Sequence, residues 1–421
     1  MTMDKRLRLF VVEPRGAGGM THYAYQMCTA LAEAGADVTL VTARQYELDS
    51  FPHNFKVEKR LNLWLPVDPS ASDLPRGTLS KIWRKIRRTV RRGGRAVRFV
   101  REWLALSSYL LRQRPDLVQF GSIQFVFEAW FLARLRRRGL TLSQICHEFE
   151  LRERGNGPLV AMANRLYAGV YQNFEAIFLH GENNRQRFLS LFDIPPERTH
   201  VIPLGNESMF LAHSADPAGG PDLRARYALP ADEPVVLFFG NLTVSKGIPD
   251  LIDAFAEVRK QVRARLVIAG YPTKYIDMDK LFRQVAELGI SDAVTFDARY
   301  IPIEEVGPLF RLATVVAYPY LSGTQSASLQ VAYAFERPVV ATRVGGLPEE
   351  VEDGKSGYLV PPHEPDKLAQ AILKVIEDPQ RAAEMGAYAR RLSETRYSWE
   401  SIAEKMMSVY RDLMSREARS H

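Results

Sequence analysis

Two glycine-containing loops have residue types that could bind a phosphorylated substrate. Gly16-Ala17-Gly18-Gly19 follows a strand-like run and precedes a helical pattern that starts near Thr21. Glycines at a helix start let backbone amides approach an anion. Phe239-Gly240-Asn241-Leu242, with Lys246-Gly247, occupies the equivalent place in the second half. Its lysine could pair with donor phosphates and neutralise the charge on a leaving group. A flexible turn and a solvated lysine are the alternatives.

A third candidate is Tyr320 to Ser328, which reads Tyr-Leu-Ser-Gly-Thr-Gln-Ser-Ala-Ser before a helical pattern. Small hydroxyl residues and glycine at a helix N-terminus suit a diphosphate, and they also cap helices. His147 ends a predicted strand, where ligands of parallel sheets bind. Glu148 beside it is a second candidate, and His180 and Asn206 end other strands. A structural histidine and a solvated acid are the alternatives for His147 and Glu148.

These segments argue against a dinucleotide cofactor. A G-x-G-x-x-G motif needs glycine where Thr21 stands, and an acid should end the second strand, which reads Val41-Thr42-Ala43-Arg44. Arg44 would be compatible with NADP. However, the second half contains no Tyr–Lys pattern of an oxidoreductase, so this class is disfavoured.

Alternating strand and helix patterns predict an α/β chain with parallel sheets. Its 421 residues exceed one typical core, so two domains are expected. We predict an N-terminal domain over 1–210, a linker over 211–230, a C-terminal domain over 231–395, and a helix over 396–421 that packs toward the N-terminal domain. The predicted strands are 7–12, 37–41, 117–120, 143–147, 176–180, 200–203, 234–239, 265–268, 293–296, 315–318 and 338–341.

Composition indicates an ordinary globular protein, with 46% hydrophobic and 25% charged residues. Cys28 and Cys146 lie far apart in apolar stretches, which favours buried thiols in a reducing compartment. The first apolar run is too short for a signal peptide or a membrane span. We therefore expect a cytoplasmic protein.

Positive charge is concentrated in the first half. Residues 1–205 carry 31 Lys/Arg against 19 Asp/Glu, a net +12, and residues 206–421 carry 25 against 30, a net −5. Eleven bases and no acid lie between Arg76 and Arg101, in a basic amphipathic segment over 76–111. Its apolar Trp83 and Trp103 are expected to support contact with a membrane. Docking on an anionic membrane, packing on the core and nucleic-acid binding are the alternatives, and no nucleic-acid motif accompanies the charge. The predicted membrane-binding residues are Arg84, Arg87, Arg88, Arg91 and Arg92.

The second half resembles the retaining glycosyltransferases of family 4. The resemblance lies in the Phe239-Gly240-Asn241-Leu242 loop with Lys246-Gly247, then 266–270 (Leu-Val-Ile-Ala-Gly), 338–349 (Pro-Val-Val-Ala-Thr-Arg-Val-Gly-Gly-Leu-Pro-Glu) and 354–361. It covers nearly all of 234–400, and the first half matches more loosely. The resemblance implies the GT-B fold, with two facing Rossmann-like domains, a nucleotide-sugar donor on the C-terminal one and the acceptor on the N-terminal one. It also implies retention, no required metal, and a histidine at 147 beside the donor sugar.

Two positions depart from the family pattern. Asn241 stands where an arginine is usual, which leaves Lys246 as the matching cation. The paired glutamates of the family fall on Gly323 and Val331, whose side chains accept no hydrogen bond. Thr324, Gln325 and Ser326 are therefore the predicted donor contacts, together with Gly240, Asn241 and Lys246. His147 and Lys246 are the predicted catalytic residues, and Gly16, Gly18, Gly19 and Glu148 the predicted cleft residues.

The resemblance and the charge pattern predict a glycosyltransferase that moves a sugar, from a UDP-sugar by preference, to a lipid-linked saccharide. Such an enzyme would be peripheral on the inner face of the membrane and would serve surface polysaccharide or glycolipid synthesis. The leaving diphosphate itself could deprotonate the acceptor hydroxyl. The alternative is a non-catalytic GT-B partner subunit, which the missing glutamates and Asn241 would suit.

Overall fold

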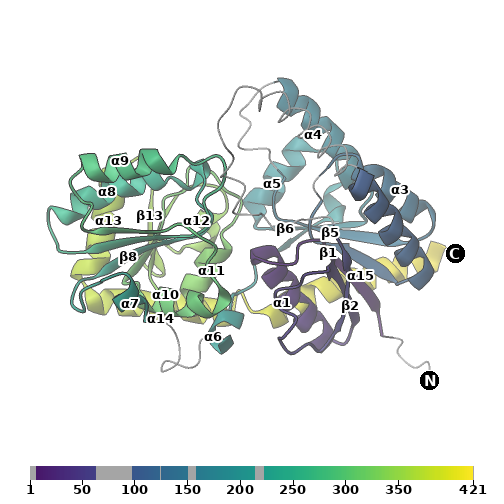
Figure 1. The fold of residues 1–421 in the computed structure, drawn as a ribbon. Helices are drawn as coiled ribbons and strands as arrows, with labels where there is room; N and C mark the ends of the chain where they lie inside the picture. Colours follow the sequence, from purple (N-terminus) through teal and green to yellow (C-terminus); the bar gives the residue numbers. More distant parts are fainter. Residues whose placement is uncertain (1–5, 63–96, 124, 150–157, 214–221, 421) are drawn as a thin grey trace.

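The computed structural model describes residues 6–62, 97–123, 125–149, 158–213 and 222–420, and it consists of two α/β domains (Figure 1). The N-terminal domain has a seven-stranded sheet of order β3-β2-β1-β4-β5-β6-β7, and the C-terminal domain a six-stranded sheet of order β10-β9-β8-β11-β12-β13. All pairings between these strands are parallel. The α/β class is thereby confirmed.

The strands of both sheets are short and their central members are apolar, as buried parallel strands require. Those of the N-terminal sheet are β1 Arg8–Glu13, β2 Asp37–Ala43, β3 Lys56–Leu61, β4 Leu117–Phe120, β5 Thr141–Cys146, β6 Ala176–His180 and β7 Thr199–Ile202. Those of the C-terminal sheet are β8 Val235–Phe239, β9 Arg265–Ala269, β10 Val294–Asp297, β11 Val315–Tyr318, β12 Val339–Thr342 and β13 Gly357–Val360.

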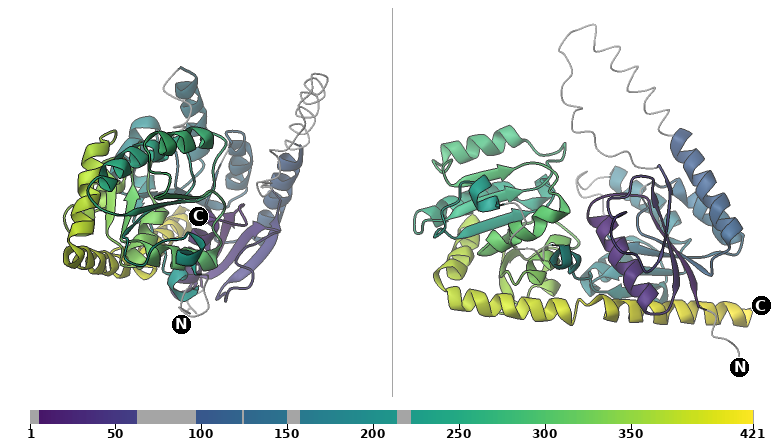
Figure 2. Two further views of the ribbon diagram at one scale, coloured as in Figure 1. Left: turned by 60° about the vertical axis from the view of Figure 1, so that its left-hand side comes forward. Right: turned by 60° about the horizontal axis from the view of Figure 1, so that its bottom comes forward.

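Helices cover both faces of each sheet (Figures 1 and 2). Those of the N-terminal domain are α1 Gly19–Glu33, a helix over 97–113, α3 Glu128–Arg137, α4 Pro158–Tyr171 and α5 Glu182–Leu191. Short helices α6 Met209–His213 and α7 Leu223–Arg226 follow. The C-terminal domain adds η4 Val244–Lys246, α8 Ile248–Arg259, α9 Met278–Glu287, α10 Ile303–Leu312, α11 Ala327–Ala334, α12 Leu347–Glu350, α13 Pro365–Glu377, α14 Pro379–Glu394 and α15 Trp399–Ser420.

Two edge strands, β3 and β13, were not predicted from the sequence. β3 reads Lys-Val-Glu-Lys-Arg-Leu and is mostly exposed, so its charged pattern resembles a loop. β13 has only four residues. The predicted end of β5 at His147 is one residue late, since β5 ends at Cys146 and His147 is the first residue beyond the strand.

The helix over 97–113 corrects one expectation about the basic segment. Trp103 was expected to support membrane contact, but only 2% of its surface is exposed. Its ring stacks on Phe120 and Phe131, with centroids 5.9 and 5.3 Å away, and its Nε1 donates to Glu128 at 3.3 Å. Trp103 is therefore a core residue. Trp83 and the five predicted membrane-binding arginines, Arg84, Arg87, Arg88, Arg91 and Arg92, lie outside the described residues.

The last helix, α15, crosses from the C-terminal domain and packs along the N-terminal one (Figure 2). Trp399 Nε1 donates to the carbonyl of Asn206 at 2.8 Å, and Tyr410 Oη donates to Gln119 Oε1 at 2.7 Å. The Tyr410 contact is buried and the Trp399 contact is partly buried, and together they tie α15 to the N-terminal domain. The predicted boundary at 211–230 stays a prediction, because residues 214–221 lie outside the described ones. None of the described helices is both long and apolar enough to cross a membrane.

Candidate active site between the two sheets

The loops after β5 and β6 contact a loop of the other domain. Thr324 Oγ1 donates to the carbonyl of His147 at 2.8 Å, and Gln325 Nε2 donates to the carbonyl of His180 at 2.8 Å. Asn184 Nδ2 donates to the carbonyl of Thr324 at 3.1 Å. The segment around Thr324, which follows β11, therefore lies directly against the carboxyl ends of the N-terminal strands. The structure brings the predicted residues of the two domains together at this place.

Two histidines pair there, His180 buried and His147 half-buried. His180 Nε2 lies 3.0 Å from His147 Nδ1, so one ring donates to the other. Burial lowers the pKa of His180 to about 4, and burial, followed by His180 and Arg15, holds the pKa of His147 well below its ordinary range. Both rings are consequently neutral near pH 7. With Nδ1 engaged by His180, His147 has Nε2 left for another partner.

Tyr23 of α1 completes this cluster. Its ring packs edge-on against His147 and His180, with centroids 4.6 and 5.6 Å away. Tyr23 Oη, His147 Nε2 and Gln325 Oε1 are all buried without a hydrogen-bond partner among the described residues. Buried polar atoms left unpaired cost free energy, so such a group suits a ligand rich in hydroxyls. Tyr23 was not predicted as a site residue from the sequence, because a tyrosine in an amphipathic helix is usually a core residue.

Lys246 lies in the loop after β8. Its Nζ is 3.5 Å from the centroid of the Tyr320 ring, a cation–π contact that fixes its direction. Gly247 has a φ of 64°, and a Cβ there would lie 1.9 Å from the carbonyl oxygen of Pro319. Only glycine allows the chain to turn so close to the loop after β11. The two predicted donor-binding loops of this domain are thus packed against each other.

The glycines of the C-terminal domain differ in how much space surrounds them. A Cβ on Gly345 would lie 1.6 Å from the carbonyl oxygen of Gly323, so Gly345 lets the loop after β12 support the Thr324 segment. A Cβ on Gly240 would meet nothing within 4 Å, although its φ of 146° favours glycine. The surface beside Gly240 is therefore open to a ligand. Asn241 next to it is exposed.

Ser326 has a different environment from Thr324 and Gln325. Its Oγ lies 2.9 Å from Tyr320 Oη, and only 3% of the residue is exposed. Ser326 thus connects the segment to the ring under Lys246. The position that the resemblance assigns to the second glutamate, Val331, lies buried on α11. The contacts of Thr324, Gln325 and Ser326 with a donor stay a prediction.

The glycine-rich loop of the N-terminal domain is closely packed at Gly16 and open at Gly18 and Gly19. Gly16 is required by packing, since a Cβ would lie 1.8 Å from the carbonyl oxygen of Gln45. Gly18, with a φ of 82°, and Gly19 have no atom within 4 Å of a Cβ, so this part of the loop is open. The amide of Gly18 donates to Glu47 Oε2 at 2.9 Å. Glu148, after His147, is exposed.

Glu47 connects this loop to the C-terminal domain, and it was missed from the sequence. Its Oε2 lies 3.1 Å from His22 Nε2, and Tyr300 of the C-terminal domain donates to its Oε1. Burial alone would raise the pKa of Glu47, but hydrogen bonds from His22, Tyr300 and Gly18 lower it. A charged Glu47 therefore orients the loop and contacts the other domain.

Glu349 makes a second contact between the domains. Its carboxylate accepts from the amides of Glu182 and Asn183, at 2.9 and 2.7 Å, at the start of α5. Gly181 precedes this helix and offers no side-chain cap. An acid at a helix N-terminus is favourable, so Glu349 caps α5 across the interface.

Glu207, after β7, is a buried acid near this site. Gln26 Nε2 donates to Glu207 Oε2 at 2.9 Å, and burial raises the pKa of Glu207 to about 8. As the pH rises from about 4.5 to about 8, the unfolded carboxyl loses its proton while the folded one keeps it, so this group lowers stability over that window.

We expect Glu207→Gln to remove this loss of stability with rising pH, since an uncharged amide suits the buried position at every pH. Thermal melting measured at pH 5 and pH 8 checks it: the Tm difference between the two pH values should shrink in the variant. An unchanged difference would show that Glu207 is ionised throughout.

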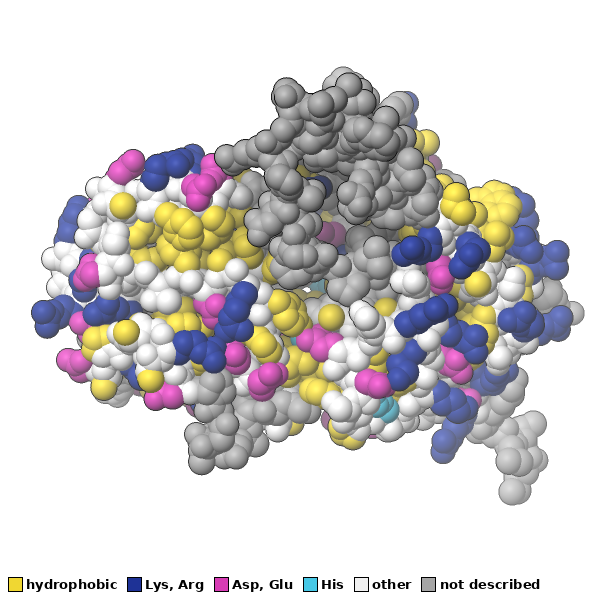
Figure 3. Space-filling view, viewed as in Figure 1, with side chains coloured by type: hydrophobic (Ala, Val, Ile, Leu, Met, Phe, Trp, Pro, Cys, Tyr) yellow, Lys and Arg dark blue, Asp and Glu magenta, His cyan; other side chains and the backbone are white. Residues whose placement is uncertain are grey.

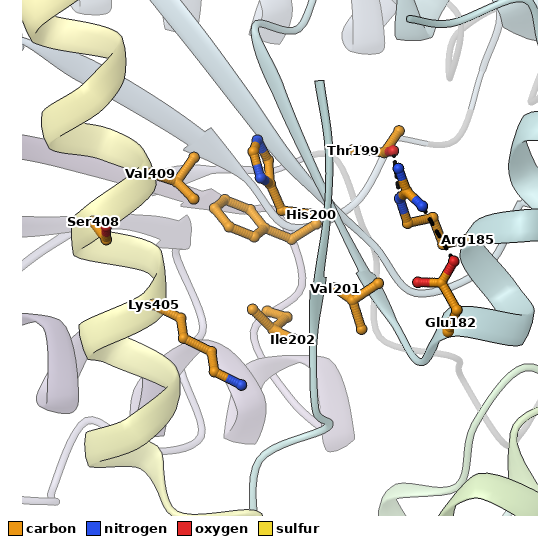
Figure 4. Close-up of a pocket in the computed structure, with 10 residues that line it drawn as sticks. Glu182, Arg185, Thr199, His200, Val201, Ile202, Lys405, Ser408 and Val409 are labelled. Carbon is orange, nitrogen blue, oxygen red and sulfur yellow. Dashed lines mark hydrogen bonds and ion pairs between the residues drawn. The ribbon is translucent and has the colours of Figure 1, made fainter. Parts of the chain in front are cut away.

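A pocket of about 460 Å³ lies elsewhere, between β7, the start of α5 and α15 (Figure 4). Its lining includes Arg185, His200 and Lys405. The guanidinium of Arg185 donates to Thr199 Oγ1 at 2.8 Å and to Glu182 at 3.1 Å, as the dashed lines show. None of the predicted site residues lines this pocket.

Comparison with known proteins identifies the family. The family described as "Glycosyl transferases group 1" matches residues 221–392, and the family described as "Glycosyl transferase 4-like domain" matches residues 18–205. The D-inositol 3-phosphate glycosyltransferase of Acidothermus cellulolyticus is 33% identical over 270 residues, which are 62% of this chain and 56% of the relative. The matched part thus spans little more than half of that relative.

Two further proteins are similar. The GDP-mannose-dependent α-(1-6)-phosphatidylinositol monomannoside mannosyltransferase of Mycolicibacterium smegmatis is 34% identical over 236 residues, 53% of this chain and 59% of the relative. The crystal structure of HepE from Anabaena in complex with UDP has a TM-score of 0.70 at 19% identity, covering 96% of this chain and all of HepE. Two family descriptions that together match most of the chain, and a shared architecture of two facing parallel sheets, lead to one conclusion: the chain belongs to the family 4 glycosyltransferases with the GT-B fold.

Proposed function

We propose that the protein is a retaining glycosyltransferase that moves a sugar from a nucleotide-sugar to a hydroxyl of a lipid-linked saccharide. The observation that carries the proposal is the cluster of Tyr23, His147 and Gln325 between the two sheets. Its buried polar atoms lack partners among the described residues, and sugar hydroxyls could supply them. Lys246, in the loop after β8 of the donor-side domain, supplies a cation for a diphosphate.

The reaction can be written without a protein nucleophile. The bond between the anomeric carbon and the diphosphate oxygen breaks, and the acceptor oxygen bonds to that carbon on the same face. The acceptor proton passes to the leaving diphosphate. Lys246 neutralises charge on the leaving group, and His147, neutral at pH 7, hydrogen-bonds the sugar through Nε2. We propose that no metal is needed, because the lysine fills the role of the cation.

We propose UDP as the nucleotide and a lipid-linked acceptor on the inner face of the cell membrane, in surface polysaccharide or glycolipid synthesis. HepE, which has a similar fold, was crystallised with UDP, and the Mycolicibacterium relative by its name acts on a phosphatidylinositol mannoside. The basic N-terminal half supports contact with an anionic membrane. The name of the same relative makes GDP the second candidate nucleotide.

A panel of UDP, GDP, ADP and TDP tests the donor. We expect UDP to raise the Tm most, since a ligand that binds the folded state stabilises it by RT ln(1 + [L]/Kd). A larger Tm rise with GDP would replace UDP in the proposal. Slow hydrolysis of the matching nucleotide-sugar by the purified chain should follow. Binding without any hydrolysis or transfer would instead favour a non-catalytic GT-B partner subunit.

A further inference from the structure

Six large apolar side chains are exposed on two segments of the N-terminal domain that contact each other, the helix over 97–113 and residues 125–130, and we call this surface the aromatic surface. Its members, with their exposed fractions, are Val97 (69%), Val100 (42%), Leu104 (40%), Phe125 (42%), Phe127 (48%) and Trp130 (59%). Figure 3 shows hydrophobic side chains beside Lys and Arg at the upper right, over the region where Figure 1 places α3. Exposed apolar groups gathered in this way mark an interaction site.

Aromatic packing holds this surface in shape. Phe99 is partly buried, and its ring lies edge-on against Phe125 and Phe127, with both centroids 5.1 Å away. Phe125 and Phe127 stack at 5.3 Å, and Trp130 packs edge-on against Phe131 at 4.9 Å. Phe131 in turn belongs to the core. The exposed rings are therefore anchored from below and need little ordering when they bind.

The charges around the aromatic surface have one sign. Residues 97–138 contain eight arginines and three acids, Glu102, Asp116 and Glu128. Glu102 and Glu128 are buried, and Asp116 accepts from the amide of Arg8 at 2.8 Å. The arginines include Arg98 and Arg101 on the helix over 97–113 and a run at the end of α3, of which Arg136 pairs with Glu175. The rings therefore lie among cations.

The C-terminal domain provides a contrast. Tyr275, Phe282 and Leu288 are also exposed, at 53, 47 and 41%. They lie on and beside α9, where residues 274–288 contain three acids, Asp277, Asp279 and Glu287, and three bases, Lys274, Lys280 and Arg283. Apolar exposure is thus common to both domains, but residues 97–138 carry a net positive charge and residues 274–288 carry none.

We propose that the aromatic surface inserts into an anionic phospholipid bilayer, with the neighbouring arginines at the headgroups. An apolar face bordered by cations is the composition of interfacial membrane-binding elements. Two copies of the same basic surface would repel each other, which disfavours self-association. The inference rests on the proposed membrane location and goes beyond it, because it assigns insertion to residues 97–130 rather than to the arginines over 84–92.

Vesicle co-sedimentation of the full chain tests the assignment. On phosphatidylglycerol vesicles, Phe127→Ser combined with Trp130→Ser should lower the partition coefficient at least tenfold, whereas Phe282→Ser on α9 should leave it within twofold of the wild type. Binding that remains at 1 M salt should be lost in the double variant, because salt screens charges and does not weaken insertion. Nucleotide-induced Tm shifts should be unchanged in both variants, which shows that they fold.

A spectroscopic measurement separates insertion from a general loss of affinity. Brominated lipids quench inserted indoles, so they should quench the wild type measurably more than Trp130→Phe, although four other tryptophans remain. Wild-type binding that the double variant retains would overturn the inference and leave the membrane location standing. Absence of vesicle binding by the wild type would overturn both. A wild-type dimer that the double variant abolishes would overturn the inference in favour of a contact between copies.

Discussion

Lys246→Ala is expected to lower kcat/KM for the nucleotide-sugar by at least tenfold, a loss of about 1.4 kcal/mol or more of transition-state stabilisation. The reason is its place in the loop after β8, where the ring of Tyr320 holds the ammonium at 3.5 Å. Charge on the diphosphate grows as the sugar leaves, so the effect should fall mainly on kcat. Steady-state hydrolysis or transfer from the donor measures it.

Lys374→Ala is the matched control for this experiment. Lys374 also lies over a tyrosine ring, 5.7 Å from the centroid of Tyr358, but on helix α13 instead of a loop at a strand end. Its removal should change kcat/KM by less than twofold. If Lys246→Ala has the kinetics of the wild type, Lys246 does not contact the phosphates, and the proposed mechanism loses its cation.

His147→Ala should lower kcat by about a hundredfold, the scale on which a single positioned hydrogen-bonding group acts in an active site. Nε2 of this ring is buried without a partner among the described residues, close to the contact between the two domains. Because burial lowers the pKa of His147, the ring stays neutral, and its protonation should not reduce activity as the pH falls from 8 to 6. Donor hydrolysis across this range checks both points.

His180 provides the control for this prediction, because its ring contacts His147 and we expect it to influence the reaction only through that contact. His180→Ala should lower kcat in the wild type but should have little further effect in the His147→Ala background, a non-additivity that a double-mutant cycle detects. Additive losses would mean that the 3.0 Å contact between the two rings does not position His147. Far-UV circular dichroism should confirm that each variant is folded.

Much of the fold could be predicted from local sequence. Buried parallel strands such as Val235–Phe239 read as continuous apolar runs, and the glycines at 240, 247 and 345 mark turns where a side chain would collide with backbone or strain the chain. The fold class and the family followed from these patterns. The edge strand Lys56–Leu61 did not, because a half-exposed strand has no apolar run to distinguish it from a loop.

The site residues, like the strands, could be predicted from the sequence only in part. The positions of His147 and Lys246 at strand ends could be predicted, because the carboxyl ends of parallel strands meet at one edge. The sequence did not indicate that His147 would pair with His180, that Tyr23 would lie against both rings, or that Glu349 would cap α5 from the other domain. These partners are 33, 124 and 167 residues apart in the chain.

The sequence by itself therefore determined the α/β class and the family, since these depend on residue type and local spacing. Only the tertiary structure decided which polar atoms are buried together and which apolar side chains are exposed. Trp103 illustrates the point: its sequence context suggested a membrane contact, yet it stacks in the core, while Trp130 on the next helix is 59% exposed. Burial depends on how distant segments pack, and local sequence does not specify that packing.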